Sequence, residues 1–280
     1  MAEAFRLPYE FVDYLLKPGL DCGSFRVPLD AYLSGNHSNG GADSAVSLIG
    51  NIRSKVRDGG TGPTLQELYG SGLDAMWRGC GHPDVIRGVW KFLCRNKEAL
   101  KSVKVGVYDR RDQGEPDEKN KVGGGTVYDL YFKGRSDKEA IAKMVDDRFF
   151  GLDCIGFMGN FMVWVGEWDT YKNNSPTRWA DKVFKNPVNK AEDIKELDLL
   201  CWSGHVAIVD WIWRMVDDTA VLVDICQSSS GGPQCNSKVI LRQTSVKSGG
   251  KRLFKIEHRG TPSMPVHSNC TIMRRDGFFY

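Results

Sequence analysis

The chain has 280 residues, of which 41% are hydrophobic and 26% charged, a balance typical of a globular protein. Its formal net charge of +3 is too small to indicate a nucleic-acid partner. No stretch approaches the roughly 20 consecutive apolar residues of a membrane-spanning helix, and the first residues lack the basic and apolar segments of a signal peptide. We therefore expect synthesis in the cytoplasm and no membrane span.

The first hundred residues are predicted to be mainly helical. Apolar side chains recur there at helical spacing, and Thr64 with Glu67 forms a capping box, in which each side chain bonds the other residue's backbone amide. Pro83 directly after His82 is typical of a first helical turn. Helices are expected at residues 9–17, at 45–56, from Thr64 onward and from His82 onward.

Two residues in this region look like site residues but are interpreted as structural. Cys22 follows Asp21, yet no apolar helix comes after it, so it lacks the setting of a nucleophile. His37 lies in a polar loop over residues 34–43 and is expected to be exposed.

The middle of the chain predicts two strands around a polar segment. Residues 104–108 form the first strand, and the alternating residues 126–132 form the second, which could pair with it. Residues 110–121 between them have almost no apolar content and are expected to be a solvated loop. A second capping box, Ser136 with Glu139, opens a helix that ends near residue 149.

Cys154 is the candidate nucleophile. It stands after Asp153, two residues before Gly156, at the start of an apolar run that predicts a buried helix. The partial positive charge of a helix N-terminus favours the thiolate, which is the reactive form of cysteine. Gly156 allows another chain segment to approach closely.

His205 is the candidate general base, and Asp224 the residue that orients it. His205 opens a strand over residues 205–210, and Asp224 interrupts the apolar strand 219–227. An acid there would orient the imidazole and stabilise its charged form. Gln227 is the alternative, because a slip of strand register changes which residue faces the imidazole.

Residues 166–196 connect the candidate nucleophile to the candidate base. This segment carries aromatic residues among polar ones, namely Trp168, Tyr171, Trp179 and Phe184. Two interpretations stay open: a wall of a substrate cleft, or an ordinary connection with aromatic anchors. Further strands are expected at residues 239–243, 252–256 and 270–275, while His258 and His267 are interpreted as surface or sheet-end residues.

The eight cysteines do not indicate a metal site. None stands in a Cys-x-x-Cys pair, and the spacings do not match zinc ligands, so no metal or cofactor is predicted. A chain of this length buries enough surface to need no disulfide. Most cysteines are therefore expected to be reduced and buried, and the two bridges considered are Cys226–Cys235 and Cys235–Cys270.

Taken together, these motifs resemble those of the NlpC-type and CHAP-type cysteine peptidases. The resemblance rests on Asp-Cys-x-Gly-Phe at 153–157, Asp-Leu-Leu at 198–200, Gly-His-Val-Ala-Ile-Val at 204–209 and an acid on the next strand. It covers roughly residues 125–280. It implies Cys154 as nucleophile, His205 as general base and Asp224, or alternatively Gln227, as the third residue.

The resemblance implies an α+β fold. A papain-like domain over residues 104–280, with the Cys154 helix packed on an antiparallel sheet, would follow a helical region over residues 1–103. The backbone amide of Cys154 is the expected oxyanion donor.

The resemblance also implies a substrate and partners. Enzymes of this family mostly cleave stem or cross-bridge peptides of bacterial peptidoglycan. Without a signal peptide, such an amidase would be an antibacterial effector, exported by a specialised secretion system to a target cell's periplasm. A partner would then be an immunity protein that occludes the cleft. The alternatives are a cysteine deamidase, transglutaminase or acyltransferase acting on a protein or lipid, and a binding module without activity.

Overall fold

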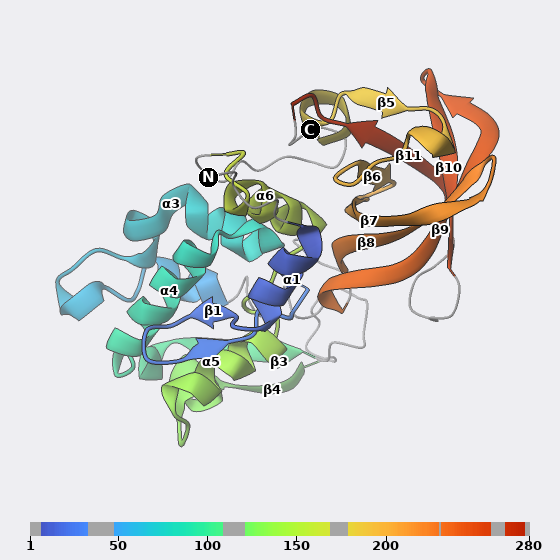
Figure 1. The fold of residues 1–280 in the computed structure, drawn as a ribbon. Helices are drawn as coiled ribbons and strands as arrows, with labels where there is room; N and C mark the ends of the chain where they lie inside the picture. Colours follow the sequence, from blue (N-terminus) through green and yellow to red (C-terminus); the bar gives the residue numbers. More distant parts are fainter. Residues whose placement is uncertain are drawn as a thin grey trace, which may run out of the picture. The chain divides into compact units, whose positions relative to one another are not determined.

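The computed structural model describes residues 7–32, 48–108, 121–168, 179–229, 231–258 and 267–277. The chain divides into two compact units, each described here by itself (Figure 1). The helical unit comprises Tyr14–Gly156 and Ser230–Pro233, and the barrel unit comprises Met1–Asp13, Phe157–Ser229 and Gln234–Tyr280. His37 and the loop at 110–120 lie outside the described residues. The predicted division into a helical N-terminal region, 1–103, and a cysteine amidase domain, 104–280, stays a prediction.

The helical unit contains the helices that the sequence patterns predicted in the first half of the chain. Both capping boxes are formed, at Thr64 with Glu67 and at Ser136 with Glu139. His82 caps the helix that Pro83 opens. The helices are α3 (Leu65–Ala75), α4 (Pro83–Arg95) and α5 (Asp137–Asp146), with helical residues also at 48–53 and shorter turns at η1 (Asp58–Gly60), η2 (Met76–Cys80) and η3 (Ala99–Ser102).

Two small antiparallel strand pairs complete the helical unit. One joins β1 (Leu20–Asp21) to β2 (Arg26–Val27), and the other joins β3 (Lys104–Tyr108) to β4 (Lys121–Thr126). The predicted strand at 126–132 is wrong, because the chain forms a helical turn at η5 (Tyr128–Phe132). Val127, Tyr131 and Phe132 are buried there, and a spacing of four to five residues places them on one side of a turn, not on one face of a strand.

Helices α1 (Pro8–Leu16) and α6 (Cys154–Trp164) each have residues in both units. Within the barrel unit, the Phe11 ring lies 5.3 Å from that of Phe157, 5.9 Å from that of Phe161 and 5.5 Å from that of Trp164. The Asp210 side chain accepts a hydrogen bond from the Tyr9 backbone amide at 2.8 Å. The contact of Phe11 with three aromatic rings of α6 explains why the residues after Cys154 are so hydrophobic.

Six strands of the barrel unit form a closed antiparallel barrel (Figure 1). They hydrogen-bond in the order β10-β9-β8-β7-β6-β11, and β11 also pairs with β10, which closes the ring. A short strand, β5, pairs with β11 outside the ring. The strands are β5 (Asn186–Val188), β6 (Leu199–Trp202), β7 (His205–Asp217), β8 (Ala220–Ser229), β9 (Gly232–Ser248), β10 (Lys251–His258) and β11 (His267–Arg274), with helical turns η6 (Trp179–Val183) and η7 (Ala191–Asp193) before β6.

Alternate residues of these strands fill the barrel core. On β7 they include Ala207 and Val209, and on β8 they include Val221, Val223 and Ile225. Because side chains alternate between the faces of a strand, residues two positions further along continue the same series. His205 and Gln227 therefore belong to the inward-facing series, and Asp224 does not.

The predicted papain-like fold, a helix on an antiparallel sheet, is wrong for this chain. The strands close on themselves, because β7 and β9 run for 13 and 17 residues and pair along both edges. The sequence predicted that the β7 strand would end at Asp210. Irregularities in its pairing with β8, at Val209/Trp211, Ile212/Arg214 and Met215/Asp217, bend the strand as barrel closure requires.

Among the described residues, no helix is both long enough and apolar enough to cross a membrane.

Candidate active site

Cys154 is the first residue of α6, and its side chain is buried, with 3% of its surface exposed. Asp153, directly before it, caps the helix: its carboxylate accepts a hydrogen bond from the Gly156 backbone amide at 2.5 Å. The thiol of Cys80 donates to the same carboxylate oxygen at 3.4 Å. A cysteine, a second thiol and a carboxyl group thus meet at one helix N-terminus, all within the helical unit.

Gly156 is needed for this arrangement. A Cβ atom at that position would lie 1.9 Å from the backbone oxygen of Gly79. The same Gly79 oxygen accepts a hydrogen bond from the Asp153 backbone amide at 2.9 Å. The expected close approach at Gly156 is therefore the approach of residues 79–80, which fixes the first turn of α6.

Burial raises the pKa of Asp153 to about 7, against hydrogen bonds from Gly156, Cys80 and Ile155 that lower it. The carboxyl group next to Cys154 therefore changes charge near neutral pH. A helix N-terminus favours the ionised form, but the loss of hydration on burial outweighs that preference.

His205 is the first residue of β7, and its ring is held by a neighbour on β8. Its Nε2 atom lies 2.7 Å from the Oε1 atom of Gln227. The ring of Trp202, on β6, lies 4.7 Å from the imidazole of His205. The same Trp202 ring lies 4.9 Å from the ring of His267, on β11. Burial lowers the pKa of His205, so the imidazole is neutral at neutral pH.

The hydrogen bonds of Gln227 decide which nitrogen of His205 carries the proton. The Nε2 atom of Gln227 donates to the Oδ1 atom of Asn236, on β9, at 2.8 Å. Its Oε1 atom therefore points toward His205 as an acceptor, and the Nε2 atom of the imidazole must donate. In a neutral ring this leaves the lone pair on Nδ1, the atom that can accept a proton.

Asp224, the predicted third residue, has other partners. Its Oδ1 atom accepts hydrogen bonds from the indole of Trp213 at 2.9 Å and from the Lys238 backbone amide at 2.8 Å. Asp224 and Gln227 are three positions apart on β8, so they lie on opposite faces of the strand. The imidazole is bonded to Gln227, the alternative that the sequence also offered.

Cys154 belongs to the helical unit and His205 to the barrel unit, so their pairing stays a prediction. The aromatic residues of the predicted cleft wall are anchors in the barrel unit. Trp168, Trp179 and Phe184 are buried, with ring distances of 5.0 Å from Trp168 to Trp179 and 5.9 Å from Trp179 to Phe184. Tyr171 lies outside the described residues.

A disulfide joins Cys226 to Cys235, one of the two bridges that the sequence suggested. Cys270 is a free, buried cysteine. Sequence reasoning missed Asn236 and the contacts of the Trp202 ring with both His205 and His267. Asn236 stands in a polar, turn-like stretch whose pairing the sequence pattern does not specify, so no signal marked it.

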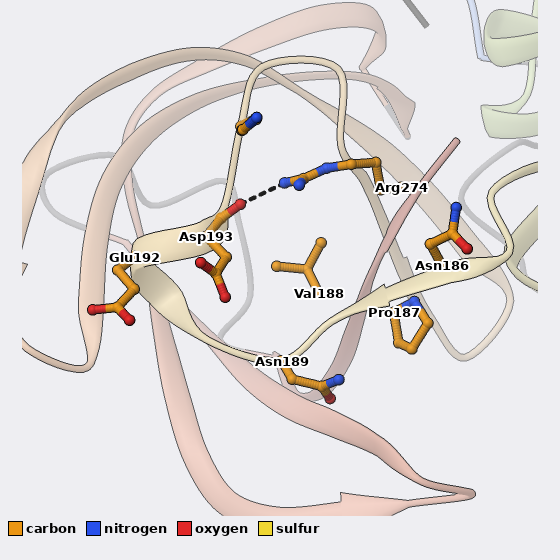
Figure 2. A pocket seen from close by; sticks show the side chains of 8 residues that line it. Asn186, Pro187, Val188, Asn189, Glu192, Asp193 and Arg274 are labelled. Atoms are coloured by element: carbon orange, nitrogen blue, oxygen red, sulfur yellow. Dashed lines mark hydrogen bonds between the residues drawn. The ribbon is translucent and has the colours of Figure 1, made fainter. Parts of the chain in front are cut away.

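A pocket of about 420 Å³ lies elsewhere on the barrel unit, among β5, η7 and β11 (Figure 2). One of its two cationic residues, Arg274, is held by both carboxylate oxygens of Asp198 at 2.8 Å and by the Asp193 backbone oxygen. Glu192 is paired with Lys190 at 2.9 Å. None of the candidate catalytic residues lines this pocket.

No group of three or more His, Cys, Asp or Glu side chains that could hold a metal ion occurs within the part of the chain that the structure describes. Comparison of the chain with protein-family models, with curated proteins and with solved structures gives no match. The resemblance to NlpC-type peptidases therefore rests on the sequence motifs alone.

Proposed function

We propose that this protein is a cysteine-nucleophile amide hydrolase, with Cys154 as nucleophile and His205 as general base. The observation that carries the proposal is the hydrogen bond from His205 to Gln227, which places the imidazole lone pair on Nδ1. Such a neutral, oriented histidine is what thiol activation requires. The position of Cys154 at the N-terminus of α6 supports the choice of nucleophile.

In the proposed reaction, Nδ1 of His205 takes the proton of the Cys154 thiol, and the thiolate attacks an amide carbonyl. The imidazolium then gives its proton to the leaving amine, which leaves an acyl-enzyme that water hydrolyses. The Cys154 backbone amide is the proposed donor to the developing oxyanion. Gln227 accepts from Nε2 throughout and keeps the ring in place.

The proposed substrate is a stem or cross-bridge peptide of bacterial peptidoglycan, and the proposed setting is delivery to a target periplasm, where an immunity protein would block the enzyme. The sequence motifs support this choice. A disulfide beside Gln227 also suits an oxidising compartment such as the periplasm.

Incubation with purified peptidoglycan, followed by mass analysis of the fragments, tests the proposal. We expect cleaved peptides with the wild type and none with Cys154→Ala. Iodoacetamide should alkylate Cys154 far faster than the other cysteines outside the disulfide, and His205→Ala should abolish that difference. Slow alkylation of Cys154 in the wild type would favour a binding module without activity.

Expression in two compartments separates the remaining alternatives. With an added signal peptide, the wild type should lyse bacteria from the periplasm, and Cys154→Ala should not. Toxicity confined to the cytoplasm would instead favour a deamidase, transglutaminase or acyltransferase acting on a protein or lipid, because assembled peptidoglycan is absent there.

A further inference from the structure

A chain of two hydrogen bonds links His205 to a residue on a third strand of the barrel. His205 on β7 bonds Gln227 on β8 at 2.7 Å, and Gln227 bonds Asn236 on β9 at 2.8 Å. Gln227 and Asn236 are buried, with 3% and 9% of their surfaces exposed. The bond between Gln227 and Asn236 is therefore closed to water, while the bond between His205 and Gln227 is partly buried.

The amide of Gln227 has two orientations of nearly equal shape. In one, its oxygen faces His205 and its NH₂ group faces Asn236; in the other, the two are exchanged. In the structure, Asn236 turns its Oδ1 atom, and not its NH₂ group, toward Gln227; this atom accepts hydrogen bonds but cannot donate one, so it favours the first orientation. The orientation of Asn236 thus determines that of the Gln227 amide, which in turn determines which ring nitrogen of His205 carries the proton.

A covalent bond holds the two strands together at this point. Cys226 directly precedes Gln227, Cys235 directly precedes Asn236, and a disulfide joins the two cysteines. A shift of β9 along β8 would separate the two amide side chains, and the disulfide prevents that shift.

We propose that Asn236 is a positioning residue that sets the tautomer of His205 through Gln227, and that the Cys226–Cys235 disulfide maintains the strand register on which this depends. This inference rests on the proposed role of His205 as general base. Within the barrel unit, the Trp202 ring on β6 lies against the imidazole of His205, and it also stacks with the ring of His267 on β11, a titratable group whose charge, after burial, lowers the pKa of His205. Neither ring fixes the proton on Nε2, because the hydrogen bond of that atom is to Gln227.

The tautomer can be measured on the wild type without any substrate. In protein labelled with ¹⁵N, long-range proton–nitrogen correlations distinguish a ring protonated on Nε2 from one protonated on Nδ1. Above the pKa of His205 we expect the Nε2–H form. A neutral ring protonated on Nδ1 would overturn the proposal, whatever the enzyme's activity.

Two substitutions at Asn236 then isolate its role. Asn236→Leu retains the branching at Cγ but has no acceptor, so His205 should show a mixture of tautomers. Partners that orient a metal-bound histidine through its second ring nitrogen are typically worth ten- to a hundredfold in activity, and we take the lower end of that range for this imidazole. We therefore expect alkylation of Cys154 by iodoacetamide at pH 7 to slow on the order of tenfold.

The matched control, Asn236→Asp, retains an acceptor and should preserve the Nε2–H tautomer and most of the rate. A Cys226→Ala, Cys235→Ala double variant should resemble Asn236→Leu in both measurements. Wild-type tautomer and rate in a folded Asn236→Leu protein would contradict the proposal; if that variant does not fold, the wild-type spectrum still decides. We call the hydrogen-bonded chain His205–Gln227–Asn236 the relay. If these measurements confirm the relay but Cys154 is inert, the proposed function is refuted and the role of Asn236 stands.

Discussion

Two buried polar clusters carry the candidate residues, and they are built on different principles. In the helical unit, Cys154 stands beside an ionisable carboxyl group, Asp153, whose pKa burial raises to about 7. In the barrel unit, His205 is held by the neutral amides of Gln227 and Asn236. The first cluster changes charge with pH, whereas the second fixes a geometry.

The difference reflects how each cluster is stabilised. Asp153 caps a helix through backbone amides and would keep that role as a neutral acid or as an amide. The relay depends on one donor and one acceptor at each contact, so a single wrong atom type breaks it. The helix cluster should therefore tolerate substitutions that the relay does not. Around neutral pH it should also change charge, because the pKa of Asp153 is about 7, whereas burial lowers the pKa of His205 and keeps that ring neutral.

The largest effect is expected at Cys154. Its replacement should remove catalysis while leaving the stability of the protein almost unchanged. Cys154→Ala should lower the rate of hydrolysis by several orders of magnitude, because it removes a member of a nucleophile–base unit. The free energy of unfolding should change by only about 1 kcal/mol, since the side chain is small. Peptide release and denaturant unfolding measure the two quantities.

Cys154→Ser should also be nearly inactive, because a hydroxyl is far less acidic than a thiol. Hydrolysis by Cys154→Ala at the wild-type rate would remove this residue from the mechanism.

The second effect concerns stability at Asp153. Its pKa rises from 3.8 in the unfolded chain to about 7 in the folded protein, so folding favours the protonated acid. That contribution is complete below about pH 4 and is lost as the pH rises through 7, with an upper limit on the order of 4 kcal/mol. Asp153→Asn retains the helix cap but cannot ionise. It should therefore make the free energy of unfolding less dependent on pH and stabilise the protein at pH 8.

Denaturant unfolding at pH 4.5 and at pH 8 measures this difference. Asp217 is the control of opposite sign, because its bond to Arg242 lowers its pKa to about 2. The contribution of Asp217 to the free energy of unfolding is lost as the pH falls. Asp217→Asn should therefore leave unchanged the decrease in the free energy of unfolding between pH 4.5 and pH 8. An equally steep decline in Asp153→Asn would show that another group is responsible.

The third effect tests the relay at its centre. Gln227→Leu leaves both the imidazole Nε2 and the Asn236 oxygen without their partner, a loss of roughly 1–3 kcal/mol in the free energy of unfolding. The rate should fall on the order of ten- to a hundredfold, because the ring loses its fixed tautomer. Gln227→Glu retains an acceptor and should raise the pKa of His205, which a pH profile of alkylation detects.

If Gln227→Leu has the wild-type rate and pH profile, the amides do not orient the base, and the contrast between the two clusters fails.

How much the sequence predicted differs between the two units. In the helical unit, the capping boxes at Thr64 and Ser136 gave two helix starts correctly, because a capping box is a local pattern within four residues. The position of Cys154 at a helix start was predicted for the same reason. At residues 126–132, alternation favoured a strand, yet the buried residues there follow a turn.

In the barrel unit, the six strands of the ring were predicted, several of them too short, but β5 and the closure of the ring were not. Closure depends on the pairing of β10 with β11 and on the length of β7 beyond Asp210, and neither is visible in a local pattern. The third residue was ambiguous because β8 is apolar on both faces: Cys226 is as buried as Ile225. With no alternation to read, the choice between Asp224 and Gln227 required the register that only the folded sheet supplies.

The smallest effect is expected at Asp224, and it gives the sharpest test of that register. Asp224 bonds the Trp213 indole and the Lys238 amide on the other face of β8 from Gln227. Asp224→Ala should leave the rate of hydrolysis and the alkylation profile of Cys154 within about twofold of the wild type. Its free energy of unfolding should fall by about 1 kcal/mol, the typical net value of such hydrogen bonds. A hundredfold loss of rate in a stable Asp224→Ala protein would return the orienting role to this carboxylate, and the hydrogen bond between His205 and Gln227 would then not be the one that matters during catalysis.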